Sequence, residues 1–160
     1  MDLDYLKKAY EIAIQYSTDK STQNGALLVS SEGEILCSAA NNFPSGVKET
    51  LERWERPTKY SFVEHAERNV IYKAAKFGIK TEGLTMYCPW FACADCGRAI
   101  IQAGIKKVIG HEVHEEHTHK SWLESIAIAS KMFDEAGIEY KYVSGRIGLN
   151  ILRNGHLIEV

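Results

Sequence analysis

The feature that most constrains this chain is a Cys-x-x-Cys pair placed where an apolar run gives way to a helical pattern. Cys93 and Cys96 follow the β-prone run Leu84 to Cys88 and open a segment with helical spacing. A second pair, His65 and Glu67, stands at another expected helix start. The exposed N–H groups and positive dipole end of a helix N-terminus stabilise thiolates, which favours metal binding. One imidazole and two thiolates suit a catalytic zinc, because three protein ligands leave the fourth position open.

Each half of this pattern is ambiguous by itself. A Cys-x-x-Cys pair also occurs in redox dithiols, and a His-x-Glu pair is common by chance. A structural zinc site would need a fourth protein ligand, for which Cys88 is conceivable, although a strand residue of this kind fits a core position better. Together, the two pairs predict His65, Cys93 and Cys96 as metal ligands. The carboxylate of Glu67 is then free to move the proton of a water.

Length, charge and cysteine content narrow the class of protein. The chain has 160 residues, which fits a single domain over 1–160, and its net charge of −2 argues against long nucleic acids as partners. No apolar run is long enough to span a bilayer, and the acidic, amphipathic N-terminus does not have the pattern of a signal peptide. Four cysteines do not make a disulfide framework here, so we expect a reducing cytoplasm.

Hydrophobic periodicity predicts an alternation of strands and helices. Helices are expected at Asp2 to about Tyr16 (capped by Asp2 or Asp4), His65 to Phe77, Ala94 to about Ala103 and Ser121 to about Ala136. Strands are expected at Gly25 to Val29, Glu34 to Ala40, Leu84 to Cys88, Lys106 to Gly110 and Ile138 to Val143. The first two strands should form an antiparallel hairpin, whereas the fourth and fifth, separated by a helix, should be parallel. The tail Gly148 to Val160 predicts a small hairpin that turns at Asn154-Gly155, with extension of the sheet and packing on a partner subunit as its two alternative uses.

Two loops are candidates for substrate contact. The irregular stretch Asn41 to Glu64, in which Val47 to Trp54 could form a short helix, is rich in Asn, Arg, Lys and aromatic residues. It favours a substrate-facing lid over a solvated surface excursion. The stretch His111 to His119 holds four histidines and three glutamates. Its spacings fit no closed zinc pattern, so a hydrated loop near the pocket mouth is favoured over a second metal site.

The His-x-Glu and Cys-x-x-Cys pairs resemble those of the cytidine/deoxycytidylate deaminase superfamily, the zinc-dependent nucleobase deaminases. The resemblance covers about residues 1 to 143. It implies an α/β fold, a three-layer α/β/α sandwich with a five-stranded mixed sheet. It further implies zinc held by His65, Cys93 and Cys96, with Glu67 as the catalytic proton shuttle. Ala92 stands where the family usually has Pro before the first cysteine, which leaves ligation intact but puts the loop path in doubt.

Three further segments resemble the deoxycytidylate type: Ser21 to Ala26, Asn41 to Gly46, and His65 to Asn69. By that resemblance Asn41 hydrogen-bonds the sugar, although Asn42 replaces the family's Gly, so allosteric control is not carried over. Trp90 falls where polynucleotide cytidine deaminases have a Trp that walls the base pocket. The expected substrate-binding residues are Asn41, Tyr60, Ala66, Trp90 and Phe91.

The resemblance favours deamination of a small cytosine nucleotide, dCMP to dUMP plus ammonia, by a homo-oligomer. Deamination of a free base or nucleoside such as cytosine, cytidine or guanine is the alternative. That alternative predicts no basic cluster at the pocket rim, whereas Arg53, Arg56, Lys59 and Arg98 could supply one. A tRNA or single-stranded DNA editor would need an extended basic groove, which the balanced charge disfavours. A non-enzymatic zinc or redox module is the remaining alternative.

Overall fold

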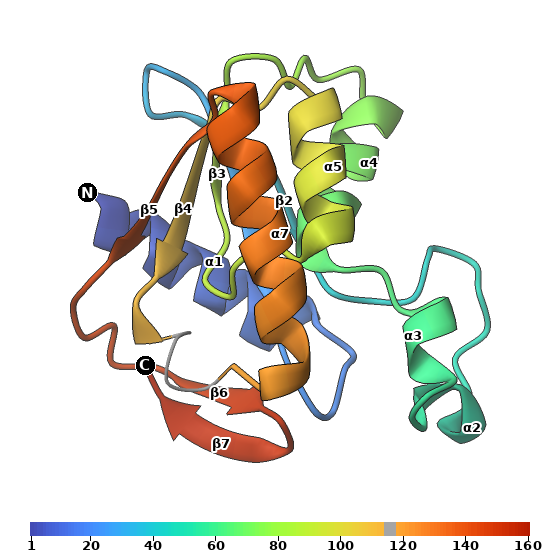
Figure 1. Ribbon diagram of the computed structural model, residues 1–160. Helices are drawn as coiled ribbons and strands as arrows, with labels where there is room; N and C mark the ends of the chain where they lie inside the picture. Colours follow the sequence, from blue (N-terminus) through green and yellow to red (C-terminus); the bar gives the residue numbers. More distant parts are fainter. Residues whose placement is uncertain (114–117) are drawn as a thin grey trace.

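A computed structural model describes residues 1–113 and 118–160, and a five-stranded mixed sheet lies at its centre (Figure 1). The strands are β1 (Gly25–Val29), β2 (Ile35–Ala40), β3 (Thr85–Tyr87), β4 (Lys107–His111) and β5 (Glu139–Val143). Their order in the sheet is β2-β1-β3-β4-β5. β1 is antiparallel to β2 and β3, whereas β3, β4 and β5 are parallel to one another. The predicted sheet is therefore confirmed, including the parallel pairing of its last two strands.

Helices cover both faces of this sheet and complete the three predicted layers. The long helices are α1 (Asp2–Tyr16), α4 (Ala66–Lys76), α5 (Ala94–Gln102) and α7 (Lys120–Ala136). Among them, α1 lies on one face, and α4, α5 and α7 lie on the other (Figure 1). Each begins and ends within one residue of its predicted position. The apolar periodicity predicted the bounds of these helices because each helix packs on the sheet through one apolar face.

The start of α1 differs from the prediction. Met1 occupies the N-cap position and no side chain caps the helix, so capping by Asp2 or Asp4 is wrong. Asp2 instead accepts a hydrogen bond from the Tyr87 hydroxyl at 2.7 Å and pairs with the Lys141 ammonium at 2.6 Å. Its carboxylate thus joins the first turn of α1 to β3 and β5. The Asp2 side chain therefore connects the helix to the sheet and does not cap the helix.

Gly25 allows α1 to lie directly against the beginning of β1. A Cβ at this position would stand 2.1 Å from the carbonyl oxygen of Ala9, which is too close for any side chain. The close contact brings the loop between α1 and β1 to the carboxyl ends of β3 and β4. The candidate site lies at that edge of the sheet.

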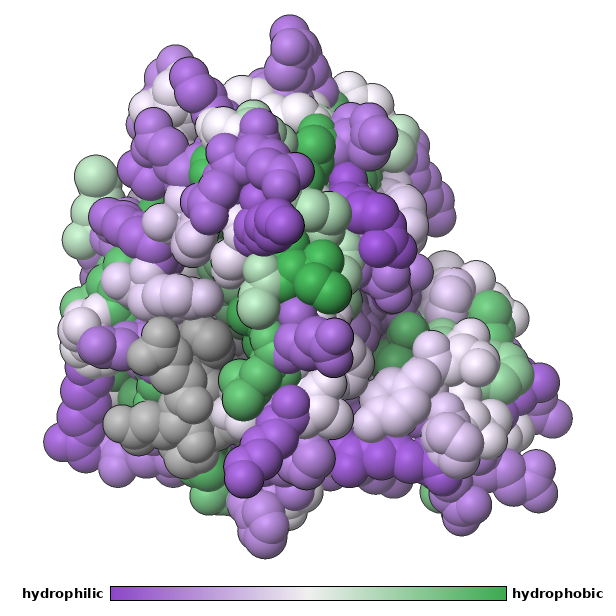
Figure 2. All heavy atoms as spheres, viewed as in Figure 1, coloured by the Kyte–Doolittle hydropathy of each residue, from purple (hydrophilic) through white to green (hydrophobic). Residues whose placement is uncertain are grey.

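The stretch Asn41 to Glu64 forms a lobe that projects from the sandwich (Figure 1). It contains two short helices, α2 (Leu51–Trp54) and α3 (Lys59–Phe62). The Phe43 ring holds them together, with its centroid 4.4 Å from Trp54 and 5.7 Å from Phe62. The predicted short helix is confirmed only over its last turn. Figure 2 shows a hollow between this lobe and the body of the protein.

The C-terminal residues form the predicted hairpin. Its strands are β6 (Asn150–Arg153) and β7 (His156–Glu159), which make a separate two-stranded sheet beside α1. Asn154 and Gly155 have φ of 53° and 80°, the pair of positive angles expected of a tight hairpin turn. Ile151 packs with Tyr10 and Trp90, so the hairpin joins the core instead of extending the main sheet. No helix in the described ranges is long and apolar enough to cross a membrane.

Candidate metal centre and substrate cleft

Two helix N-termini bring the predicted ligands together. His65 is the N-cap residue of α4, Cys93 is the N-cap residue of α5, and Cys96 lies in the first turn of α5. The Nδ1 atom of His65 is 3.6 Å from the sulfur of Cys93 and 3.5 Å from that of Cys96. All three ligand atoms lie within 4.8 Å of one another. The predicted set is thus assembled on one side of the sheet.

These separations fit a tetrahedral zinc ion. With Zn–S bonds of about 2.3 Å and Zn–N bonds of about 2.0 Å, tetrahedral angles place nitrogen and sulfur about 3.5 Å apart. Among the described residues, the group contains one imidazole and two thiols, and Cys88 does not belong to it. The structural-zinc alternative, for which Cys88 was a conceivable fourth ligand, therefore has no support among the described residues. A set of three protein ligands is the kind that leaves one position for water or substrate.

The two thiols have pKa values that are shifted in opposite directions. The pKa of Cys93 is lowered to about 4, first because Cys96 donates a hydrogen bond to it, and also because His65 stands beside it. The pKa of Cys96 is raised well above its ordinary value, because it shares the proton with Cys93 and is buried. One thiolate is therefore ready to bind, and a metal ion would displace the remaining proton.

Glu67 lies two residues after His65, in the first turn of α4, and is not part of the ligand group. Its side chain is 2% exposed, and burial raises the pKa of its carboxyl above the ordinary value. Asn24 directs its amide Nδ2 at this carboxyl, 3.4 Å from Oε2, and also lies 3.3 Å from the sulfur of Cys88. A buried carboxyl with a raised pKa is suited to accepting and returning a proton near neutral pH.

The two ligand-bearing helices are joined by a further ion pair. Arg68 on α4 pairs with Glu64 and lies 3.5 Å from Asp95 on α5. Ser125 on α7 accepts a hydrogen bond from the backbone N–H of Ala94 at 2.9 Å. Such outer contacts orient metal ligands and limit their motion.

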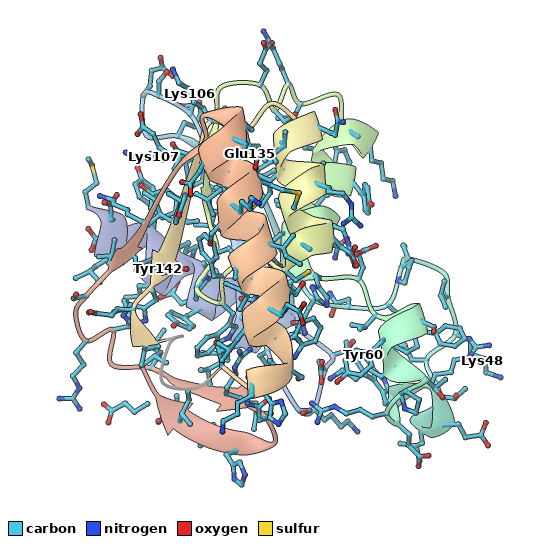
Figure 3. The ribbon with its side chains drawn as sticks, in the orientation of Figure 1. Lys48, Tyr60, Lys106, Lys107, Glu135 and Tyr142 are labelled. Carbon is cyan, nitrogen blue, oxygen red and sulfur yellow. The ribbon has the colours of Figure 1, made fainter. Side chains whose placement is uncertain are left out.

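A cleft of about 770 Å³, which includes the space at its open mouth, leads from solvent to this group. Its described lining contains all five predicted substrate contacts, namely Asn41, Tyr60, Ala66, Trp90 and Phe91, together with His65, Glu67 and Cys93. Tyr60 is on α3, on the side of that helix that faces the body of the protein (Figure 3), and its ring centroid is 6.0 Å from that of Trp122. The Trp122 ring also lies 5.7 Å from the His65 imidazole. The lobe and the start of α7 therefore face each other across the entrance.

Asn41 is already engaged with the protein. Its Oδ1 accepts hydrogen bonds from the Ser17 hydroxyl at 2.7 Å and the Asn24 N–H at 2.8 Å. Its Nδ2 donates to the Thr22 carbonyl at 2.7 Å and lies 3.3 Å from an oxygen of Asp19. These contacts fix the loop between α1 and β1. A contact with a substrate sugar stays a prediction and would have to be made in addition to them.

The four basic residues considered for the rim separate into two pairs. Arg56 and Lys59 line the cleft, and the ammonium of Lys59 pairs with Asp19 at 2.6 Å. Arg53 and Arg98 lie outside the described lining. The Arg53 guanidinium stacks 4.5 Å from the centre of the Phe62 ring, and Arg98 pairs with Asp95. Two of the four basic residues expected at the rim therefore line the cleft.

The loop His111 to His119 lies partly outside the described residues, because 114–117 are not among them. His111 is buried, with Nδ1 2.8 Å from the Tyr10 hydroxyl and Nε2 2.8 Å from the Gly145 carbonyl. His119 accepts a hydrogen bond from the Ser121 N–H and caps α7. Thr118 lines the cleft, as expected of a loop near its mouth. Within the described ranges, no second group of metal-binding side chains occurs.

Several residues of the cleft lining were given no role from the sequence, among them Asn24, Trp122 and Arg153. Asn24 lies in the segment Ser21 to Ala26 that resembles the deoxycytidylate type, but that resemblance gave it no role of its own. Trp122 has the helical spacing of a core residue. The sequence does not show that the first turn of α7, which carries it, lies at the cleft. Arg153 lies in the C-terminal hairpin, and nothing in the local sequence shows that this hairpin folds back onto the cleft.

Comparison with known proteins gives a consistent result. Residues 1–112 match the family model of the cytidine and deoxycytidylate deaminase zinc-binding region. The deoxycytidylate deaminase of Mus musculus is 34% identical over 144 residues, which cover 86% of this chain and 77% of that protein. An uncharacterized deaminase in the luxG 3′ region of Aliivibrio fischeri is 34% identical over 133 residues, covering 83% and 87%. The dCMP deaminase of cyanophage S-TIM5, solved in complex with dCMP and dUMP, is 26% identical with a TM-score of 0.64, covering 88% of this chain and 94% of that one.

Proposed function

This chain belongs to the cytidine and deoxycytidylate deaminase family of zinc-dependent hydrolases, and from that premise we propose that it converts dCMP to dUMP and ammonia. The observation that carries the proposal is the three-ligand group of His65, Cys93 and Cys96 beside the buried carboxyl of Glu67, at the end of an open cleft. The similarity to deoxycytidylate deaminases supports dCMP as the substrate.

The chemistry follows from the roles of these side chains. Zinc held by His65, Cys93 and Cys96 would lower the pKa of a water at its open position toward neutrality. Glu67 accepts the proton that this water loses and delivers it to N3 of the cytosine ring. The water oxygen forms a bond to C4. The remaining proton on that oxygen passes through Glu67 to the exocyclic nitrogen. The bond from C4 to this nitrogen then breaks, and ammonia leaves. One water is consumed, and the base becomes uracil.

The aromatic lining supplies the base pocket. Trp90 is fixed by the hydrogen bond from its indole N–H to the Gln23 carbonyl at 2.8 Å, so its ring can serve as a rigid wall. Phe91 and Ala66 line the cleft beside it, and Tyr60 and Trp122 stand nearer the entrance. Flat apolar surfaces of this kind hold a planar base by stacking and limit the access of water to the proton-transfer step.

The proposal also covers the domain organisation, the compartment and the assembly of the protein. Residues 1–160 would act as a single domain, because the strands and helices share one layered core. A reducing cytoplasm fits the four cysteines, all of which are free thiols. Assembly into a homo-oligomer, expected from the family resemblance, can be measured by light scattering coupled to gel filtration.

Ammonia release from a panel of substrates tests the proposal. The zinc-loaded protein is assayed with dCMP, CMP, deoxycytidine, cytosine and guanine under identical conditions. We expect dCMP to give the highest kcat/KM. Faster release from a free base or nucleoside would replace the assigned substrate, and no release from any compound would remove the deaminase assignment.

A further inference from the structure

The C-terminal hairpin lies beyond residues 1–112, the region that the family model matches, yet it forms part of the cleft. Arg153, the last residue of β6, and Asn154, the first residue of the turn, are both in the cleft lining. The entrance is thus bounded by the lobe, the start of α7 and a segment from the end of the chain. The hairpin therefore contributes side chains to the site that lie outside the matched zinc-binding region.

Four hydrogen bonds hold this hairpin against the loop between α1 and β1. The Gln23 N–H donates to the Leu152 carbonyl at 2.9 Å, and the Leu152 N–H donates to the Gln23 side chain at 3.1 Å. The Asn154 N–H donates to the Thr22 hydroxyl at 3.1 Å, and the Gly155 N–H donates to the Ser21 carbonyl at 2.8 Å. These four bonds, all donated by backbone N–H groups, fix the position of the turn and of the Arg153 backbone beside it.

The Arg153 guanidinium is placed by Trp90. It lies 4.3 Å from the centre of the Trp90 ring, a cation–π contact, and that ring is itself fixed by Gln23. The charge therefore stands at the wall of the proposed base pocket. This contact restricts the position of the guanidinium, and the planar geometry of such a group matches that of phosphate oxygens.

A second guanidinium is tied to the same loop. Arg56 lines the cleft, and its Nη2 lies 3.3 Å from the Ser21 hydroxyl. The carbonyl of Ser21 accepts the N–H of Gly155, in the hairpin turn beside Arg153. Ser21 thus links Arg56 to the hairpin turn that follows Arg153. Lys59, the third cation of the described lining, is committed to its ion pair with Asp19.

We propose that Arg153 and Arg56 bind the 5′-phosphate of the substrate, so that the C-terminal hairpin selects nucleotides over nucleosides. The inference rests on the proposed function and adds to it the residues that recognise the phosphate. Guanidinium groups bind phosphate oxygens through paired, charge-assisted hydrogen bonds. The protein has a net charge of −2, so a dianionic substrate gains from local positive charge at the entrance.

The test compares the binding of dUMP and deoxyuridine to the zinc-loaded protein by calorimetry. In Arg153→Gln we expect dUMP affinity to fall about 10- to 100-fold, because a charge-assisted hydrogen bond is lost, while deoxyuridine affinity changes by less than about 3-fold. Arg56→Gln should show the same selectivity with a smaller loss. Inorganic phosphate should compete with dUMP for the wild type and only weakly for Arg153→Gln.

Arg146→Gln is the matched control, because Arg146 is exposed, pairs with Glu159 on the hairpin and is absent from the described cleft lining. It should bind dUMP as the wild type does. Arg153→Lys, which keeps the charge but loses the planar donor set, should fall between the wild type and Arg153→Gln. Thermal unfolding of each variant shows whether the hairpin is still folded.

Equal losses of dUMP and deoxyuridine affinity would overturn the proposal, because Arg153 would then only support the Trp90 wall. Unchanged dUMP affinity in Arg153→Gln, or a wild type that binds neither dUMP nor phosphate, would also overturn it. The two proposals fail separately. A wild type that binds dUMP through Arg153 but releases no ammonia from dCMP would keep the phosphate site and remove the assigned reaction.

Discussion

The two walls of the cleft are built in different ways. The inner wall contains His65, Glu67 and Cys93, which lie together with the predicted ligand Cys96 at the starts of two helices packed on the central sheet. The outer wall consists of Arg56, Tyr60, Trp122 and Arg153, which come from the lobe, the start of α7 and the C-terminal hairpin. Tyr60 is 47% exposed, whereas Glu67 is 2% exposed. The proposed reacting groups are thus held by regular structure, and the groups proposed to select the substrate lie on peripheral segments.

This difference makes a kinetic prediction for the two walls. Substitutions in the inner wall should remove zinc or lower kcat, because these groups act on the reacting atoms. Substitutions in the outer wall should mainly raise KM, because these groups contact parts of the substrate that do not react. The following experiments are ordered from the largest expected effect to the smallest.

Cys93→Ser should lose zinc and all measurable ammonia release, because a neutral hydroxyl is a poor zinc ligand beside one thiolate and one imidazole. Elemental analysis of the purified variant gives the zinc content directly. Cys37→Ser is the control, since Cys37 is a buried thiol on β2 outside the ligand group. Full zinc content and turnover in Cys93→Ser would show that Cys93 is not a ligand.

Glu67→Gln should keep its zinc but lower kcat by about 10²- to 10⁴-fold, the usual contribution of a positioned proton carrier. The amide is nearly isosteric with the carboxyl, so binding of dUMP should change little. Stopped assays of ammonia release at saturating dCMP measure the effect. Near-normal kcat in this variant would remove Glu67 from the reaction and break the proposed division between the walls.

Asn24→Val should lower kcat by about 3- to 10-fold without loss of zinc, because the Glu67 carboxyl loses one hydrogen-bond donor. The measurement is kcat at saturating dCMP, with zinc content as a check. Asn69→Ala, which removes an amide bonded to the Ala40 carbonyl away from the described cleft lining, serves as the control. A change in KM alone would reassign Asn24 to substrate binding.

Tyr60→Ala should raise KM for dCMP by about 2- to 5-fold and leave kcat unchanged, because a partly exposed aromatic contact contributes little to binding. Tyr72→Ala is the matched control, since Tyr72 is an exposed tyrosine on α4 that is not in the described cleft lining. Initial rates over a range of dCMP concentrations separate the two parameters. A fall in kcat would mean that the outer wall also acts on the chemical step.

The inner wall could be predicted from the sequence, whereas the outer wall could be predicted only in part. His65 with Glu67, and Cys93 with Cys96, are neighbours on single helix starts, so local spacing fixes their geometry. Tyr60 was found from the composition of its loop. Arg153 was missed because its place depends on hydrogen bonds to Thr22 and Gln23, about 130 positions away in the chain. Asp2 was misassigned as a cap because its partners, Tyr87 and Lys141, are also far from it in the chain.

The central claim is that a single zinc, bound by His65, Cys93 and Cys96, makes this chain a dCMP deaminase. The direct measurement is ammonia release from dCMP as zinc is added back to chelator-treated protein. We predict no turnover without metal, and a rate that rises with zinc until one ion per chain is bound. Turnover by the zinc-free protein, or no ammonia from the fully loaded protein, would contradict the claim.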